Sequence, residues 1–233
     1  KEKVAVIGGG LGGLSAAISL RQKGYEVDLY EQNEHLGGKL NRLEQDGFGF
    51  DLGPSILTMP QIFEALFRNS GKRMGDYVAI QRLNHQWRSF FPNGNRIDLY
   101  ENLKDMDERN PSLTEKDIKQ YKDLLDYSKG LYDITEQGYF GQGLDDLKEV
   151  LAFYGVFQSL RKFDLSSTMF GAIEKRISNP QFRDMLSYIV KYVGSSAYDA
   201  PAVLNMMIYM QHAQGIWYVP GGMHHLAQAL VTL

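Results

Sequence analysis

The sequence lacks cysteine, and it has neither a strong charge excess nor a long apolar run. The absence of cysteine from 233 residues excludes disulfides, thiolate nucleophiles and cysteine metal sites, and it agrees with a reducing compartment. The formal net charge of −3 is nearly balanced, so we expect no nucleic-acid partner. No apolar run reaches the roughly 18 residues that predict a membrane-spanning helix. The first residues lead directly into a strand pattern, so we expect no signal peptide and a cytoplasmic location.

Glycine, in contrast, is abundant, and its first cluster has a dinucleotide-binding pattern. Residues 4–7 predict a buried strand, which Gly8, Gly10 and Gly13 follow in G-x-G-x-x-G spacing. Gly8 would make the tight turn, Gly10 would let backbone N–H groups approach a pyrophosphate, and Gly13 would let helix and strand pack closely. A helix ending at Gly24 should offer its first N–H groups to the phosphates. Its expected inward face is Leu14, Ala16, Ala17 and Leu20.

An acidic residue completes this pattern at the end of the next predicted strand, residues 27–30. Glu31 stands about 20 residues beyond the glycines, where a carboxylate accepts hydrogen bonds from ribose hydroxyls. The alternative is a glycine-rich loop in an ordinary α/β fold, but such a loop does not require Glu31 at this place. The pattern therefore predicts a dinucleotide site.

Two further glycine segments favour FAD over NAD as the dinucleotide. Gly37, Gly38 and Lys39 offer a second stretch of backbone and a point charge for phosphate, although a plain turn is the alternative. Residues 51–55 predict a third close turn, on which a flavin ring would rest. The expected cofactor contacts are Gly8, Gly10, Leu11, Gly12, Gly13, Glu31, Gln32, Gly37, Gly38, Lys39, Gly53, Pro54 and Ser55.

The chain resembles the bacterial phytoene desaturase family, the carotenoid branch of the flavin amine oxidase superfamily. The matching segments are 6–13, 30–31, 36–39, 46–48, 50–55 and 218–223. Within that family it is most similar to enzymes that oxidise the terminal methyl group of thirty-carbon carotenoids of the diaponeurosporene or diapolycopene type. The segments of this closer match are 30–33, 55–60, 85–92, 97–101, 175–180 and 191–196.

This resemblance implies a fold, a cofactor and an activity. The implied fold is α/β, a Rossmann-like FAD-binding domain of the flavin amine oxidase type with an inserted, mostly helical substrate domain. The implied activity is oxidation of a terminal methyl group of an acyclic, lipophilic carotenoid. Desaturation of a carotenoid precursor is the runner-up, and a non-catalytic flavin- and pigment-binding module is the alternative from another class. Family members are about twice as long, so we expect a chain truncated at its C-terminus.

The sequence pattern changes near residue 104 from strand-rich to helical and changes back near residue 216. We therefore expect an FAD-binding domain over 1–103 and 216–233, and a helical substrate and membrane-associating domain over 104–215. The patterns of the first domain predict helices over 61–69 and 223–230, strands over 77–80 and 217–219, and a hairpin over 86–100. Those of the second predict helices over 114–136, 144–160, 179–194 and 201–215, and one capped by Ser167.

The helical block raises two hypotheses about apolar ligands. The helix over 201–215 is apolar around most of its circumference, which is typical of a core helix or of a channel for a rigid polyene. Aromatic pairs at 139–140 and 153–154, near Arg161 and Lys162, would dip into a membrane interface without crossing it. We therefore expect a peripheral membrane protein.

No side chain stands out as a catalytic acid, base or metal ligand, so the catalytic residues stay unknown. His85, His212, His224 and His225 lack metal-ligand spacing, and His224 and His225 should point in different directions on a helix. Asp51 is interpreted as a turn-forming residue, with a catalytic base as the alternative. Trp87 and Arg88 are interpreted as core and strand-surface residues. The flavin itself would carry the redox chemistry.

Overall fold

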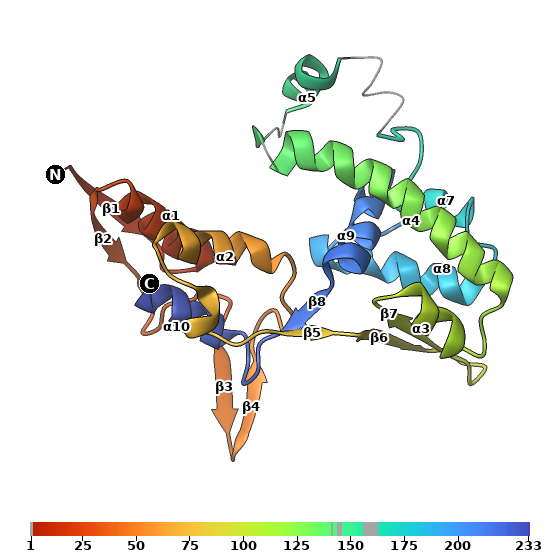
Figure 1. Ribbon diagram of the computed structural model, residues 1–233, viewed down its shortest axis with the longest axis horizontal. Coiled ribbons are helices and arrows are strands. Elements are labelled where there is room, and N and C mark those ends of the chain that lie inside the picture. The colour runs from red at the N-terminus through yellow and green to blue at the C-terminus, as the bar shows by residue number, and fades with distance from the viewer. Residues whose placement is uncertain (1, 141, 144–145, 156–162) are drawn as a thin grey trace. The chain divides into compact units, whose positions relative to one another are not determined.

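The computed structural model describes residues 2–140, 142–143, 146–155 and 163–233 (Figure 1). The chain divides into two compact units, unit 1 with Lys1–Leu83 and Ile216–Leu233, and unit 2 with Asn84–Gly215. Unit 2 thus begins at Asn84, ahead of residue 104, where the sequence pattern becomes helical. The reason is the hairpin of β6 (His85–Phe90) and β7 (Arg96–Tyr100), which buries Ile97 and Leu99 in the core of unit 2.

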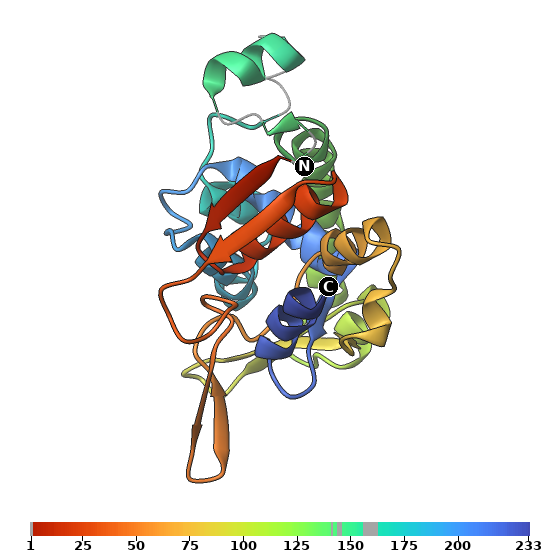
Figure 2. The same ribbon diagram turned by 90° about the vertical axis from the view of Figure 1, so that its left-hand side faces the viewer.

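Unit 1 begins with a parallel strand pair and the helix between them. β1 (Lys3–Ile7) pairs with β2 (Glu26–Tyr30), and α1 (Leu11–Gln22) covers one face of the pair (Figure 2). The expectation that β1 is buried is wrong, because β2 is its only strand partner in the described chain and Ile7 is 89% exposed. Ala16 is also exposed, since it lies on the outer face of α1, whereas Leu14 is buried.

A hairpin and two helices follow in unit 1. β3 (Arg42–Gln45) and β4 (Phe48–Asp51) form a hairpin that projects from α1 and α10 (Figures 1 and 2). α2 (Pro60–Asn69) and the 3₁₀ turn η1 (Met74–Asp76) lead to β5 (Gln81–Leu83), which pairs with β8 (Ile216–Tyr218). The strand predicted at 77–80 is wrong, because the N–H groups of Tyr77 and Val78 donate to the Met74 carbonyl within the turn.

The core of unit 1 joins the two ends of the chain. α10 (His224–Thr232) buries Leu226 and Leu230 in a cluster that also contains Leu14, Phe67 and Val219. Helix α10 begins one residue later than predicted and ends two residues later. Because α1 and α10 share this cluster, the position of the glycine-rich loops depends on a helix far away in sequence.

Unit 2 combines the β6–β7 hairpin with a set of helices. Helix α4 (Glu115–Thr135) begins with the predicted capping box, in which Thr114 and Asp117 bond to each other's backbone N–H groups. Long α4 packs against α9 (Figure 1). The other elements are α3 (Leu103–Glu108), η2 (Glu136–Phe140), α5 (Leu147–Tyr154), α7 (Met169–Glu174), α8 (Pro180–Ser187), η3 (Tyr188–Val193), η4 (Ala202–Asn205) and α9 (Met206–Gln214).

Several helix boundaries of unit 2 differ from the predicted ones. The helix predicted over 144–160 ends at Gly155, which has a positive φ of 76°. Thr168, and not Ser167, caps α7, because its side chain accepts the hydrogen bond from the Gly171 N–H. The helix predicted over 179–194 tightens into the 3₁₀ turn η3 after Ser187, and the one over 201–215 begins as the 3₁₀ turn η4.

The apolar helix α9 is a core helix. Met206, Met207 and Ile208 are buried in the same cluster as Leu124 and Leu131 of α4. The core interpretation is therefore confirmed for these three residues, while Met210 is half-buried. Within the described ranges, no helix combines the length and the apolar character that crossing a bilayer requires.

A buried carboxylate holds the β6–β7 hairpin together. Asp98 accepts hydrogen bonds from Arg88 Nε at 2.7 Å and Arg88 Nη2 at 3.0 Å, and His85 Nε2 lies 3.3 Å from it. Burial by itself raises the pKa of Asp98, but the hydrogen bonds and charge from Arg88 and His85 outweigh it and hold that pKa below its ordinary value. Arg88 is thus exposed on strand β6, as predicted, and is also the ion-pair partner of a buried acid.

Candidate cofactor site

The fingerprint loop has the geometry that its glycines predict. Gly8 has a φ of 99°, and its N–H donates to the Tyr30 carbonyl at 2.7 Å, which makes the tight turn after β1. A Cβ on Gly13 would lie 1.8 Å from the Gly8 carbonyl oxygen, so only glycine allows this packing. No described side chain caps α1 at Gly10, and its first turn contains no acidic residue. The N–H groups that begin at Leu11 and Gly12 therefore present positive partial charge to an anion.

Glu31 ties this loop to the segment after β2. Its Oε2 accepts a hydrogen bond from the Gly9 N–H at 2.6 Å, and its Oε1 accepts from the Asn33 backbone N–H at 2.9 Å and from Asn33 Nδ2 at 2.7 Å. Hydrogen bonds from the Asn33 backbone and then from Gly9 lower the pKa of Glu31. The carboxylate is therefore oriented and kept ionised beside the loop.

The second and third glycine segments lie against the first. Gly37 N–H donates to the Gly9 carbonyl at 2.7 Å, and a Cβ on Gly38 would lie 3.1 Å from the Gly10 Cα. A Cβ on Gly53 would lie 2.1 Å from the Lys39 carbonyl oxygen. Three segments that are separate in sequence thus form one glycine surface, at which the side chains of larger residues would crowd the neighbouring backbone.

A fourth segment closes this surface, and the sequence did not identify it as part of the site. Asp51 Oδ1 accepts a hydrogen bond from the Met223 N–H at 3.0 Å, and Arg42 Nη1 donates to the Gly221 carbonyl at 2.9 Å. Gly222 has a φ of 114°, and a Cβ there would lie 2.9 Å from Asp51 Oδ1. The interpretation of Asp51 as a structural residue agrees with this contact.

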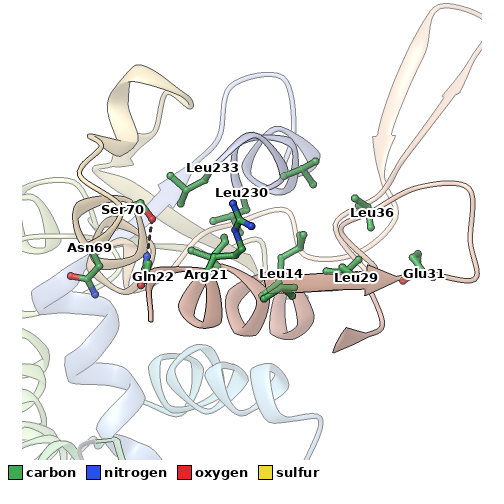
Figure 3. Close-up of a pocket in the computed structure, with 14 residues that line it drawn as sticks. Leu14, Arg21, Gln22, Leu29, Glu31, Leu36, Asn69, Ser70, Leu230 and Leu233 are labelled. Atoms are coloured by element: carbon green, nitrogen blue, oxygen red, sulfur yellow. Dashed lines mark hydrogen bonds between the residues drawn. The ribbon is translucent and has the colours of Figure 1, made fainter. Parts of the chain in front are cut away.

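An open pocket of about 750 Å³ adjoins Glu31. Figure 3 shows Glu31 and Leu36 at one end, Leu14 and Leu29 in the middle, and Gln22, Asn69 and Ser70 at the other end. Gln22 Nε2 donates to Ser70 Oγ at 2.7 Å. The volume is in the range of small-molecule sites. Its lining is Leu14, Ala17, Ile18, Arg21, Gln22, Val27, Leu29, Glu31, Leu36, Asn69, Ser70, Leu230, Val231 and Leu233.

The histidine pair at the start of α10 differs from its prediction. The rings of His224 and His225 lie 4.0 Å apart between centroids, so the expectation that they point in different directions is wrong. Both residues occupy the first turn of α10, where the chain has only begun to wind. Burial first, then the nearby His225 and Arg42, lower the pKa of His224. In the part of the chain that the structure describes, no group of three His, Asp or Glu side chains could hold a metal ion.

Most of the predicted contact residues fall into three groups. The backbone of Gly8, Gly10, Gly13, Gly37 and Gly38 comes together around Glu31. In contrast, four members contribute side chains that are exposed: Gln32, Lys39, Pro54 and Ser55. Leu11 and Gly12 begin α1.

Gly9 and Asn33 were missed as residues that position Glu31. For Gly9, the available signal was a glycine at the middle position of the run Gly8–Gly10, and the structure shows that a Cβ there would lie 2.2 Å from the Leu36 side chain. For Asn33, only the tertiary hydrogen bonds to Glu31 reveal the role.

Comparison with known proteins confirms the predicted resemblance. Residues 6–69 match the model of an NAD(P)-binding Rossmann-like domain. The chain is 60% identical over 230 residues to a 4,4'-diaponeurosporene oxygenase of Staphylococcus aureus strain bovine RF122 / ET3-1, covering 99% of this chain and 46% of that protein. It therefore spans about half the length of the curated relatives that it matches.

Solved structures share the fold at low sequence identity. A putrescine oxidase with bound putrescine superimposes with a TM-score of 0.64 at 16% identity, covering 100% of this chain and 49% of the other. The cyclohexylamine oxidase of Brevibacterium oxydans IH-35A gives a TM-score of 0.60 at 17% identity, covering 99% and 48%. The predicted α/β, Rossmann-like fold of the amine oxidase type is therefore confirmed.

Proposed function

We propose that the protein is part of an FAD-dependent oxygenase that oxidises a terminal methyl group of an acyclic carotenoid of the 4,4'-diaponeurosporene type. The observation that carries this proposal is the 60% identity over nearly the whole chain to an oxygenase of that name. Identity at this level extends through both units, so it includes unit 2 as well as the glycine-rich loops.

The glycine surface of unit 1 supports FAD as the cofactor. The pyrophosphate would lie at Gly10 and the start of α1, and Glu31 would accept hydrogen bonds from a ribose. The segments at 37–39 and 53–55 would follow the rest of an extended dinucleotide, because they present backbone where a Cβ on Gly38 or Gly53 would collide. Bound FAD would supply two-electron redox chemistry, while these residues bind and orient it.

No side chain of the described chain needs to act as the acid or base in this proposal. Asp51, the one candidate base, is engaged with the Met223 N–H and Gly222 in unit 1. The protein's contribution would then be orientation of substrate against cofactor and exclusion of water.

A lipophilic substrate also supports a membrane location. A carotenoid dissolves in the acyl region of a bilayer, so the protein would work as a peripheral protein at the inner face of the cell membrane. Of the aromatic residues first expected at that interface, Phe153 is exposed. Arg161, Lys162 and the side chains at 139–140 lie outside the described residues.

Product analysis tests the proposal. The purified protein, supplied with FAD, is incubated with diaponeurosporene in liposomes, with and without oxygen. The masses of the products are then measured by mass spectrometry. A terminal oxygenase adds oxygen at the methyl group only when air is present. A desaturase removes two hydrogens and adds no oxygen. A binding module would bind the pigment unaltered and give no product. Either of these results overturns the proposal.

A further inference from the structure

Unit 2 exposes a compact patch of aromatic residues around one lysine. The aromatic–lysine patch consists of Trp87 and Phe90 of β6 together with Tyr188, Lys191, Tyr192 and Val193 of η3. The 3₁₀ turn η3 is two-sided, because Ile189 and Val190 are buried in the core while the other four residues face outward. Phe90 is 76% exposed, Val193 is 53% and Tyr188 is 52%. Exposed apolar groups in one place mark an interaction surface.

Lys191 gives this patch an unusual electrostatic character. Its Nζ lies 3.6 Å from the ring centroid of Trp87, 4.5 Å from that of Tyr188 and 5.7 Å from that of Tyr192. Among the residues that the structure describes, no carboxylate lies within salt-bridge distance of Lys191. Burial among the rings lowers the pKa of the ammonium. An anion from outside the protein would therefore find a cation with three donors and no acidic partner.

An open groove with both polar and apolar lining lies beside the patch. It has a volume of about 360 Å³. Arg88 and Asp184 line it with opposite charges, and the Arg88 guanidinium is already paired with Asp98. The other lining residues are Trp87, Ser89, Phe90, Phe91, Met185 and Tyr188.

We propose that the aromatic–lysine patch docks onto anionic phospholipid, with Lys191 at the phosphate and Phe90, Tyr188 and Val193 among the upper acyl chains. The proposal rests on the peripheral membrane location proposed above and names the surface and the lipid for it. Tryptophan and tyrosine concentrate at the headgroup level because one end of each ring is apolar and the other polar. A lysine stem reaches from apolar surface to the phosphate layer.

Another exposed apolar surface in the chain has the opposite charge character. The β3–β4 hairpin of unit 1 exposes Leu43, Phe48 and Phe50, and Phe48 is 67% exposed. Its turn contains Asp46, which an anionic headgroup layer repels, whereas Glu44 is paired with Arg42 of the same hairpin at 3.3 Å. Phe48 is therefore a matched control for Phe90.

The two tryptophans of the chain make the test direct, because Trp87 lies in the patch and Trp217 lies in β8 of unit 1. Trp217→Phe leaves Trp87 as the only indole, and Trp87→Phe leaves Trp217. Both variants are mixed with phosphatidylglycerol vesicles whose acyl chains are brominated, and tryptophan quenching is measured. We expect quenching of Trp87 and none of Trp217. Quenching of Trp217 alone, or of neither indole, overturns the proposal.

Binding of variants to vesicles supplies the second measurement. Lys191→Gln should weaken sedimentation with phosphatidylglycerol vesicles on the order of fivefold and leave phosphatidylcholine binding unchanged. Lys129→Gln is the control, because Lys129 also lies near a ring, that of Tyr209, but is paired with Asp133 at 2.5 Å. Phe90→Ser should weaken binding about tenfold and Phe48→Ser should not. Equal losses in the paired variants overturn the proposal.

Two further readouts separate this proposal from others. Circular dichroism of each variant shows that the fold is retained, so a loss of binding reports the surface. Conversion of carotenoid in detergent micelles reports the proposed activity without a bilayer. If carotenoid is converted but Trp87 is not quenched, the proposed lipid-binding patch is wrong and the proposed activity is retained. If Trp87 is quenched but no carotenoid is converted, the proposed activity is wrong and the lipid-binding patch is retained. Self-association that Phe90→Ser abolishes, with vesicle binding unaffected, would assign the patch to a second copy and overturn the lipid proposal.

Discussion

Asp51 and Met223 are 172 positions apart in sequence, yet the Asp51 carboxylate accepts a hydrogen bond from the Met223 N–H at 3.0 Å. This contact anchors the start of α10 to the end of β4. It also joins the segment at 220–223 to the turn at 51–55, where the cofactor is proposed to lie. The hydrogen bond therefore links the assembly of unit 1 to the shape of its glycine surface.

The first prediction concerns Asp51. Asp51→Ala should lower the free energy of unfolding by about 1 kcal/mol, because the Met223 N–H at the helix start loses its acceptor. Asp51→Asn retains an acceptor oxygen and should lose less stability and keep its activity. Chemical denaturation and turnover are measured for both variants. A stable Asn variant without activity would favour the alternative in which Asp51 is a catalytic base.

The second prediction compares two glycines of the fingerprint loop. Gly13→Ala should prevent FAD binding and destabilise unit 1, because the added Cβ would lie 1.8 Å from the Gly8 carbonyl oxygen. Gly12→Ala is the matched control, since its Cβ meets no atom within 4 Å and alanine favours the helix by up to about 1 kcal/mol. Thermal melting should show opposite shifts for the two variants. Similar destabilisation by both would contradict the packing argument.

The third prediction concerns Glu31 and the choice of dinucleotide. Glu31→Ala should weaken FAD binding at least about tenfold, because it removes charge-assisted hydrogen bonds to a ribose and releases the Gly9 N–H. Calorimetry on the purified protein measures the affinity, with NAD as the comparison. Tighter binding of NAD than of FAD would show that the second and third glycine segments do not select the cofactor.

The pH dependence of FAD binding follows from the hydrogen bonds to Glu31. The Asn33 backbone first, then Gly9, holds the pKa of Glu31 below its ordinary value. The ionised form therefore persists as the pH falls, and FAD affinity should stay constant from pH 8 down to about 5. In the Asn33→Ala variant, the Glu31 carboxylate loses the hydrogen bond from Asn33 Nδ2 and is oriented less firmly. A loss of affinity already between pH 7 and 6 in the unaltered protein would contradict this account.

The fourth prediction concerns the buried Asp98 in unit 2. Asp98→Asn should lower the free energy of unfolding at pH 7 by about 2 kcal/mol, since Arg88 loses an ionised partner. The folded pKa of Asp98 is lowered, so its stabilisation is complete above the unfolded value of about 3.9 and is lost as the pH falls through the folded value. Below about pH 4 the difference between wild type and variant should therefore shrink. The exposed Asp107→Asn variant is the control and should show no such difference.

Local sequence patterns were sufficient where a few neighbouring residues determine the backbone. Gly8 and Gly24 end β1 and α1 where predicted, and Thr114 with Asp117 opens α4. In each case a positive φ or a local hydrogen bond decides the conformation, and both depend on residue type within one turn of chain. Thr168, which caps α7 in place of the neighbouring Ser167, shows the limit, because two adjacent hydroxyls offer the same local signal.

Other features could not be read from local patterns because distant residues decide them. The segment at 77–80 has strand-forming residues, but its N–H groups are taken by the turn at Met74. The hairpin at 85–100 belongs to unit 2 because Ile97 and Leu99 find their apolar partners there. Burial of Asp98 with Arg88 similarly depends on how β6 and β7 align.

The sequence by itself determined the dinucleotide pattern, since glycine spacing and Glu31 are properties of the order of residues. Tertiary structure alone decided that Gly37, Gly38 and Gly53 meet the fingerprint loop, and that Gly222 and Asp51 close the same surface. It also decided that Lys191 lies among three aromatic rings, whereas Lys3 and Lys129 pair with carboxylates. The physical reason is that contact between distant segments depends on how helices and strands bury their apolar faces, which no short stretch of sequence specifies.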